Sequence, residues 1–210
     1  MHGRLQKIIL LILVISGWFA LIAQFYIIIE NRAASIAETV VRYFSFFTIF
    51  TNLIVAVCCS VILLSSASNG SKFFRRSTTL TAVAVYITVV GIVYNTILRF
   101  LWNPQGLQLI VDELLHSIIP VLFIVLWFLS TSAPELKWKN IFPWLLYPVA
   151  YIIYVLIRGS FSGFYPYPFI DVSSLGYAKV LANCIGLLFF FLFLSASFAA
   201  VGRWKQKFNR

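Results

Sequence analysis

Residues 112–131 read DELLHSIIPVLFIVLWFLST, and almost every side chain after His116 is apolar. The run is too long and too apolar for a helix on the surface of a soluble protein. It approaches the roughly 20 residues that cross the hydrocarbon core of a bilayer. We therefore predict a membrane-spanning helix over 112–131. His116 stands at the mouth of this helix, where a polar group in hydrocarbon is costly unless it is paired or functional.

The whole chain has the composition of a membrane protein. Of its 210 residues, 61% are apolar and 10% are charged, whereas soluble domains carry about 25% charged residues. No segment between the apolar runs is long enough for a second domain, so we expect one integral membrane domain over residues 1–210. The net charge of +10 comes from short basic clusters between apolar runs. Such clusters indicate membrane topology and argue against a nucleic-acid partner.

Five further runs are long enough to span, and none alternates as a membrane β-barrel requires. Because backbone polar groups in lipid must be satisfied internally, we predict an all-α membrane protein, an antiparallel up-and-down bundle of transmembrane helices. The six predicted spans lie at about 7–29, 43–65, 78–101, 112–131, 140–158 and 174–201. The first run is too long for the apolar part of a signal peptide. In the fifth, Pro143 fits the opening turn and Pro148 is expected to kink the helix.

Lys and Arg residues divide unequally between the two ends of this bundle. Eleven fall at the end that holds both termini, and five fall at the other end. The positive-inside rule therefore predicts a multi-pass protein of the cell membrane whose N and C termini are cytoplasmic. In that orientation Thr48, Asn95 and His116 lie towards the outer face, within about one helical turn of a common depth.

The second predicted span contains FFTIFTN, which places Thr48, Thr51 and Asn52 on one helix face. A threonine hydroxyl bonded to a histidine is an activated nucleophile when a third group fixes the imidazole tautomer. Asp112 lies four residues before His116 and is the candidate for that role. Each residue also has a structural interpretation: threonine bonds back to a carbonyl, asparagine joins two helices, and Asp112 caps its helix.

The loop RGSFSGFYPYPFID, residues 158–171, precedes the last span and is rich in aromatic side chains. Its prolines favour an extended backbone. Tyr165, Tyr167 and Phe169 either form an aromatic belt at the membrane interface or cover an outer cavity and contact its substrate. Asn183, in the last span, either binds substrate with them or joins two helices.

Several common functional signatures are missing from the chain. It has no G-x-S-x-G elbow, no phosphate-binding glycine loop and no H-E-x-x-H motif. With one internal histidine and no paired carboxylates deep in the spans, we predict neither a metal site nor a cofactor. Cys58, Cys59 and Cys184 lie inside apolar runs and are interpreted as buried thiols.

Three short motifs, FFTIFTN, HSIIP and YPF (167–169), occur in an order that resembles the androgen-induced-gene / FAR-17a family. That family consists of small multi-span membrane proteins, includes hydrolases of fatty acid esters of hydroxy fatty acids, and has bacterial six-span relatives. The resemblance implies that Thr48 is the nucleophile and His116 its histidine partner. Thr51, in the second F-T pair, is the rival nucleophile.

The resulting hypothesis is a threonine-dependent lipid ester hydrolase whose site lies in the outer half of the bundle. Thr48 attacks the ester, His116 serves as general base, Asp112 orients His116, and Asn52 or Asn95 stabilises the oxyanion. The first alternative is a non-catalytic lipid-binding or transport protein that uses the same cavity. The second is a structural subunit that packs through small residues near the end of the last span. Those residues are Ser195, Ala196, Ser197, Ala199, Ala200 and Gly202.

Overall fold

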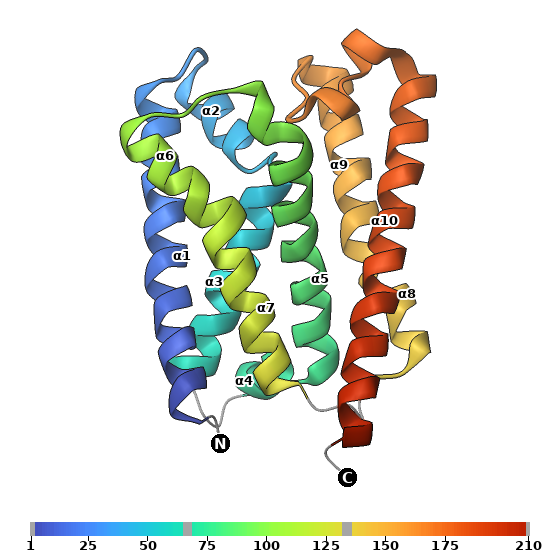
Figure 1. The fold of residues 1–210 in the computed structure, drawn as a ribbon. Coiled ribbons are helices and arrows are strands. Elements are labelled where there is room, and N and C mark those ends of the chain that lie inside the picture. Colours follow the sequence, from blue (N-terminus) through green and yellow to red (C-terminus); the bar gives the residue numbers. More distant parts are fainter. Residues whose placement is uncertain (1–2, 65–68, 132–135, 209–210) are drawn as a thin grey trace.

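The computed structural model describes residues 3–64, 69–131 and 136–208, and this part of the chain is helical, without strands. Six segments are long and apolar enough to cross a membrane, which confirms the predicted all-α bundle of six spans. In Figure 1 the long helices stand side by side, with α1 beginning and α10 ending at the same end of the bundle. The segments are Arg4–Glu30, Phe47–Leu64, Ser77–Leu101, Gly106–Ser130, Trp138–Ser162 and Val172–Lys205.

Several spans are built from more than one helix. In chain order the elements are α1 (Arg4–Glu30), α2 (Ile36–Tyr43), α3 (Phe47–Leu64), α4 (Asn69–Phe74), α5 (Ser77–Val93), η1 (Tyr94–Leu98), η2 (Arg99–Leu101), α6 (Gly106–Glu113), η3 (Leu114–Ile118), α7 (Ile119–Ser130), η5 (Trp138–Asn140), α8 (Ile141–Trp144), α9 (Leu146–Ser162), η6 (Pro168–Ile170) and α10 (Val172–Phe208). η1 and η3 are π-helical turns, whereas η2, η5 and η6 are 3₁₀ turns.

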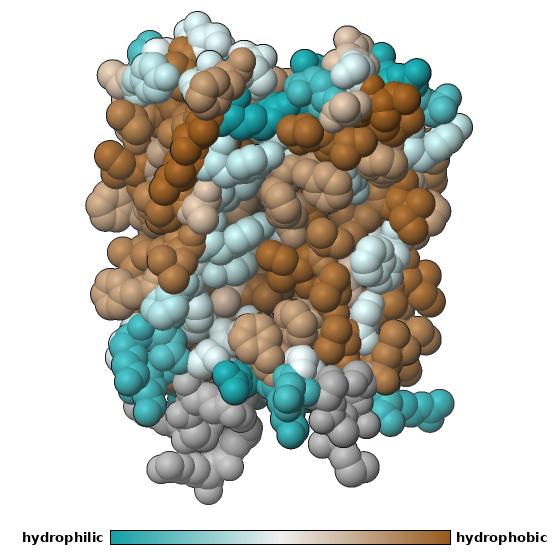
Figure 2. All heavy atoms as spheres, turned by 180° about the vertical axis from the view of Figure 1, so that it is seen from behind, coloured by the Kyte–Doolittle hydropathy of each residue, from teal (hydrophilic) through white to brown (hydrophobic). Residues whose placement is uncertain are grey.

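The surface of the bundle is divided into an apolar middle and two polar ends. In Figure 2 brown hydrophobic side chains cover most of the middle of the face shown, and teal residues gather at its two ends. Large apolar side chains that point outward, such as Ile15 and Ile22 of α1 and Phe189 of α10, are more than half exposed. An apolar surface of this extent would promote aggregation in water but matches a lipid environment.

Three of the six small residues of the last span, Ser195, Ala199 and Gly202, face the inside of this same chain, whereas Ala200 is exposed. Ser195 and Ala199 are buried, and a Cβ added at Gly202 would lie 2.4 Å from the Leu136 side chain. Gly202 therefore allows the end of α10 to approach Leu136 closely. The stripe that could have served as a contact with another subunit is partly used within the chain.

The second and fourth spans begin elsewhere than predicted. Span two starts at Phe47 rather than at residue 43, because α2 is a separate helix whose N-cap, Ser35, accepts a hydrogen bond from the Glu38 amide. Span four starts at Gly106 rather than at residue 112, so its first turn lies well before Asp112. The interpretation of Asp112 as a helix cap is therefore wrong.

The fifth span is interrupted at Leu145, one turn before Pro148. Proline has no N–H to donate to the carbonyl four residues earlier, and its ring crowds that carbonyl. The carbonyl in question belongs to Trp144, and it accepts a hydrogen bond from the Tyr86 hydroxyl at 2.7 Å. Tyr86 of α5 thus satisfies the backbone group that Pro148 leaves without a partner inside the span.

Candidate functional site

His116 lies in the π-helical turn η3, which joins α6 to α7. Pro120 explains the irregularity, because it has no N–H with which to bond the carbonyl of His116. The backbone widens instead, and the Ile119 amide bonds to Leu114, five residues back. The freed His116 carbonyl accepts a hydrogen bond from the Asn95 side chain at 3.1 Å. Isolated π-helical turns are often found at functional sites.

The neighbouring span has a π-helical turn of its own at η1, and the two turns are in contact. Gly91 makes the close approach possible. A Cβ at this position would lie 3.3 Å from the His116 carbonyl oxygen and 3.2 Å from the Cβ of Pro120. Spans three and four are therefore closely packed at the level of His116.

The imidazole of His116 is contacted on one ring face and at Nδ1. Its ring stacks on Tyr94, with centroids 3.7 Å apart and an interplanar angle of 15°. Nδ1 lies 2.9 Å from the Asp112 carbonyl oxygen and 3.2 Å from the carboxylate Oδ1. Both neighbours of Nδ1 are acceptors, so this nitrogen carries the proton. In the neutral imidazole the lone pair is then on Nε2, which has no hydrogen-bond partner among the described residues.

Asp112 is buried and belongs to a small polar network. Its Oδ2 accepts a hydrogen bond from the Tyr94 hydroxyl, which in turn accepts one from the Trp102 indole at 2.9 Å. A carboxylate is therefore fixed on the Nδ1 side of His116, as expected for a residue that orients an imidazole. Glu113, the next residue, points elsewhere and pairs with Arg99.

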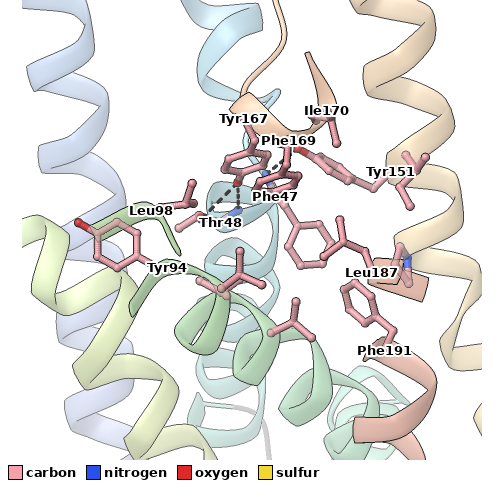
Figure 3. A pocket seen from close by; sticks show the side chains of 15 residues that line it. Phe47, Thr48, Tyr94, Leu98, Tyr151, Tyr167, Phe169, Ile170, Leu187 and Phe191 are labelled. Atoms are coloured by element: carbon pink, nitrogen blue, oxygen red, sulfur yellow. Dashed lines mark hydrogen bonds between the residues drawn. The ribbon is translucent and has the colours of Figure 1, made fainter. Parts of the chain in front are cut away.

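Thr48 is the second residue of α3 and lies beneath the aromatic loop, as Figure 3 shows. Its amide donates to the Tyr167 hydroxyl at 3.3 Å, and its own hydroxyl lies 3.4 Å from the same oxygen. Thr51 has a different environment. It is fully buried, and its hydroxyl lies 3.1 Å from that of Tyr147.

A cavity of about 370 Å³ brings the candidate residues together. Thr48, Asp112, His116 and Tyr167 all line it, and Thr51 does not. The volume falls in the range of small-molecule sites. No hydrogen bond joins Thr48 directly to His116 in the described part of the chain. The two residues therefore face one space without touching through a hydrogen bond.

A second, narrower space of about 60 Å³ adjoins this cavity. The two spaces share Thr48, Tyr94, Leu98 and Tyr167. Figure 3 shows Thr48 between Tyr94 on one side and Phe47, Phe169 and Tyr151 on the other. The smaller space is walled mainly by apolar side chains, so Thr48 lies between an apolar compartment and the cavity that contains Asp112 and His116.

The three asparagines predicted to bind substrate lie elsewhere. The Asn52 amide group donates to the Thr48 and Leu115 carbonyls at 2.9 and 3.2 Å, and that of Asn95 donates to Gly91 as well as His116. Asn183 donates to the Phe169 carbonyl at 2.8 Å. None of the three lines either space. Their amides donate hydrogen bonds to backbone carbonyls, which agrees with the interpretation that these asparagines stabilise the fold.

The aromatic loop divides into residues at the site and residues away from it. Phe169 lines the narrow space and stacks on Tyr167, with centroids 5.3 Å apart. Tyr165 packs instead against Gly159 of α9, where a Cβ would fall 2.1 Å from its ring. Burial raises the pKa of the Tyr167 hydroxyl, so Tyr167 is a neutral proton donor at neutral pH.

An ionic cluster links α2 to α9. Glu38 accepts hydrogen bonds from Arg42 at 2.8 Å and Arg158 at 2.7 Å, and both guanidinium groups lie over the ring of Phe164. The hydrogen bond from Arg42, with the nearby charge of Arg158, lowers the pKa of Glu38. This cluster holds the start of the aromatic loop in place.

The cavity residues that were not identified from the sequence include Tyr94, Trp102, Gln24 and Gln108. Gln108 of α6 donates to Gln24 of α1 at 2.9 Å across the cavity wall. Gln24 lies inside the first predicted span, so the argument applied to the asparagines would have found it, whereas Gln108 lies before the predicted start of span four. Tyr94 and Trp102 gave no comparable signal, because aromatic residues are common in membrane helices and at their ends.

The described residues contain no group of three or more side chains that could hold a metal ion. No family model, curated protein or solved structure matched the chain in the comparisons. The functional argument therefore rests on the geometry of the site.

Proposed function

We propose that the protein is an intramembrane lipid ester hydrolase in which Thr48 is the nucleophile and His116 the general base. The observation that supports this most is the state of His116. The Asp112 backbone carbonyl accepts a hydrogen bond from Nδ1, the Asp112 carboxylate lies 3.2 Å from the same nitrogen, and the lone pair on Nε2 remains for the cavity that His116 and Thr48 both line. The His116 side chain is 13% exposed, so a substrate or a water molecule can reach it.

The proposed reaction has two halves. In the first, Thr48 Oγ1 bonds to the ester carbonyl carbon while its proton passes to His116 Nε2, and collapse of the intermediate expels the alcohol, which takes that proton. In the second, water attacks the acyl-threonine with the same proton transfers and releases the acid. Asp112 orients the imidazole and stabilises its charged form, through the contact between Oδ1 and Nδ1.

A lipid ester is the proposed substrate class because the cavity reaches the apolar surface. Leu101 and Trp102 line the cavity and are 61% and 46% exposed. A ligand can therefore enter from the lipid side near the end of span three. The resemblance of the FFTIFTN, HSIIP and YPF motifs to the androgen-induced-gene / FAR-17a family supports the same substrate class. The excess of Lys and Arg at the end with the termini supports cytoplasmic termini and a site towards the outer face of the cell membrane.

The test uses purified full-length protein in detergent or nanodiscs with a fluorogenic fatty acyl ester. Thr48→Ala and His116→Ala should each lower kcat by at least about 10³-fold. Thr51→Ala is the matched control, because Thr51 is one turn away and contacts Tyr147 rather than the cavity. The proposal fails if both site variants fold and hydrolyse the ester as fast as the parent. Loss of activity in Thr51→Ala alone would assign the nucleophile to Thr51.

A second candidate function is non-catalytic lipid binding or transport in the same cavity. It is favoured by one observation, namely that the Thr48 hydroxyl contacts Tyr167 and is not hydrogen-bonded to His116. A fluorophosphonate probe separates the two functions. A hydrolase should be labelled covalently at Thr48, with labelling lost in Thr48→Ala, whereas a binding protein should take up lipid without labelling or turnover.

A further inference from the structure

The hydroxyl of Tyr167 lies against two atoms of Thr48 at once. Its oxygen is 3.3 Å from the Thr48 amide nitrogen and 3.4 Å from Oγ1. The amide belongs to the first turn of α3, where N–H groups have no partner within the helix and the helix dipole is positive. The phenol oxygen of Tyr167 is therefore bound at the N-terminus of α3, next to the proposed nucleophile Thr48.

This position is where the hydrolysis mechanism requires an oxyanion site. When Thr48 Oγ1 attacks an ester, the former carbonyl oxygen becomes negative while it is two bonds away from Oγ1. In serine proteases the backbone N–H of the nucleophile itself is one of the oxyanion donors. The Thr48 amide is suited to the same task, because its present partner is the oxygen of a side chain and not a backbone carbonyl.

The side chains expected from the sequence to stabilise the oxyanion have no free donor for it. Both N–H bonds of the Asn52 amide group point to backbone carbonyls, and the Asn95 amide group is bound to Gly91 and His116. On the cavity wall, Tyr94 donates to Asp112 and Tyr43 donates to the Leu21 carbonyl. Tyr167 is the phenol that contacts Thr48 itself.

Tyr167 is also held rigidly. Pro166 and Pro168 flank it, and its ring stacks on Phe169 with an interplanar angle of 5°. Phe46 makes a T-shaped contact with the same ring, at a centroid distance of 5.7 Å. A donor that is already oriented needs little reorganisation when charge develops, and this is the source of most oxyanion stabilisation.

We propose that the phenol O–H of Tyr167 and the backbone N–H of Thr48 form the oxyanion site, which makes Tyr167 a catalytic residue. Without substrate, the Thr48 N–H donates to the phenol oxygen. When an ester binds, its carbonyl oxygen enters beside the phenol oxygen and accepts hydrogen bonds from both the Thr48 N–H and the phenol O–H, while the ring of Tyr167 stays in place. Tyr167 keeps its proton throughout, and the proton of Thr48 passes to His116. The inference rests on the proposed hydrolase function.

The test compares Tyr167→Phe with Tyr165→Phe in full-length protein, with kcat and KM measured on the same fluorogenic ester. Tyr165 is the matched control because it is a phenol of the same loop that packs on Gly159 away from the cavity. Loss of one oxyanion donor lowers kcat by about 10²- to 10³-fold. We expect that loss in Tyr167→Phe with little change in KM, and no loss in Tyr165→Phe.

A second measurement separates an oxyanion donor from a residue that only supports the fold. The thiono analogue of the ester has sulfur in place of the carbonyl oxygen, and sulfur is a weak hydrogen-bond acceptor. The parent should prefer the oxygen ester strongly, and Tyr167→Phe should lose most of that preference. A structural defect would slow both substrates equally, and that result would overturn the inference.

The outcomes distinguish this inference from the proposed function. If Thr48→Ala is inactive while Tyr167→Phe keeps kcat within about twofold of the parent, the hydrolase function stands and the role of Tyr167 is wrong. If the parent does not hydrolyse esters, or Thr48→Ala is as active as the parent, the proposed function fails and the oxyanion site fails with it.

Discussion

The carbonyl oxygen of His116 is hydrogen-bonded by the side chain of Asn95 at 3.1 Å, across the interface between spans three and four. Pro120 is the reason that this carbonyl is free, and Gly91 is the reason that the two helices approach closely enough for the bond to form. The proline that disrupts the backbone near His116 thus also fixes the register of two spans. The irregular backbone at the site is tied to the neighbouring span rather than left exposed to lipid.

The first prediction concerns this hydrogen bond. Asn95→Ala leaves the His116 carbonyl without its side-chain donor, which costs about 1–3 kcal/mol when the group is buried. We expect a lower unfolding free energy in detergent, measured by chemical denaturation. Asn183→Ala is the control, because Asn183 is exposed and bonds to the loop carbonyl of Phe169. Equal losses in the two variants would contradict the special role of Asn95.

The second prediction concerns Asp112. Asp112→Asn keeps the size of the side chain and removes the charge beside His116 Nδ1, while the backbone carbonyl at 2.9 Å still holds the imidazole. We therefore expect kcat for ester hydrolysis to fall by about 10- to 10²-fold, less than in His116→Ala. Glu113→Gln removes the adjacent carboxylate, which pairs with Arg99, and should leave kcat unchanged. A full loss in Glu113→Gln would point to the net charge of the region and not to Asp112.

The coarse fold and the location of Thr48 and His116 near one another could be predicted from sequence, because both depend on local patterns. Apolar runs of sufficient length specify six spans whatever their neighbours are. Thr48 and His116 stood out as polar groups near the ends of two such runs, and the structure places both on one cavity. Asp112 was linked to His116 by its spacing of four residues, and the contact exists although the helix begins earlier than expected.

The remaining features depend on contacts between segments far apart in sequence. The sequence around Asn52 and Asn95 does not show whether the side-chain amide contacts a ligand or a backbone carbonyl of another span. In the case of Asn95, that carbonyl lacks its helical donor because of a proline in the neighbouring span. Tyr167 could be placed in an aromatic loop, but its position over the Thr48 amide depends on how α9 and α10 hold that loop. The π-helical turn η3 follows from Pro120, but its close fit against η1 depends on Gly91 of the neighbouring span.

The third prediction concerns the pH dependence of the ionic cluster formed by Glu38, Arg42 and Arg158. Hydrogen bonding from Arg42 and the charge of Arg158 lower the pKa of Glu38 below its usual value of 4.5. The stabilisation is therefore complete above pH 4.5 and is lost as the pH falls through the lowered pKa. The protection of α2 amides against hydrogen exchange, measured relative to the intrinsic exchange rate at each pH, should therefore fall over that acidic range. Glu38→Gln should show lower protection at neutral pH, with little further change on acidification, and a parent protein that shows no acid-induced change would contradict the prediction.

The fourth prediction couples Tyr86 to Pro148. The Tyr86 hydroxyl donates to the Trp144 carbonyl, which has no backbone donor because residue 148 is proline. Tyr86→Phe leaves that carbonyl without a partner, and we expect a loss of about 1–3 kcal/mol in unfolding free energy. Pro148→Ala introduces an N–H four residues after Trp144, which can take over the bond. In the Pro148→Ala background the same Tyr86→Phe change should therefore lower the unfolding free energy by less.

Chemical denaturation of the four proteins, analysed as a double-mutant cycle, measures the coupling free energy between Tyr86 and Pro148. Additive losses would mean that the break at Leu145 persists without the proline, and that the Tyr86 bond does not compensate for Pro148.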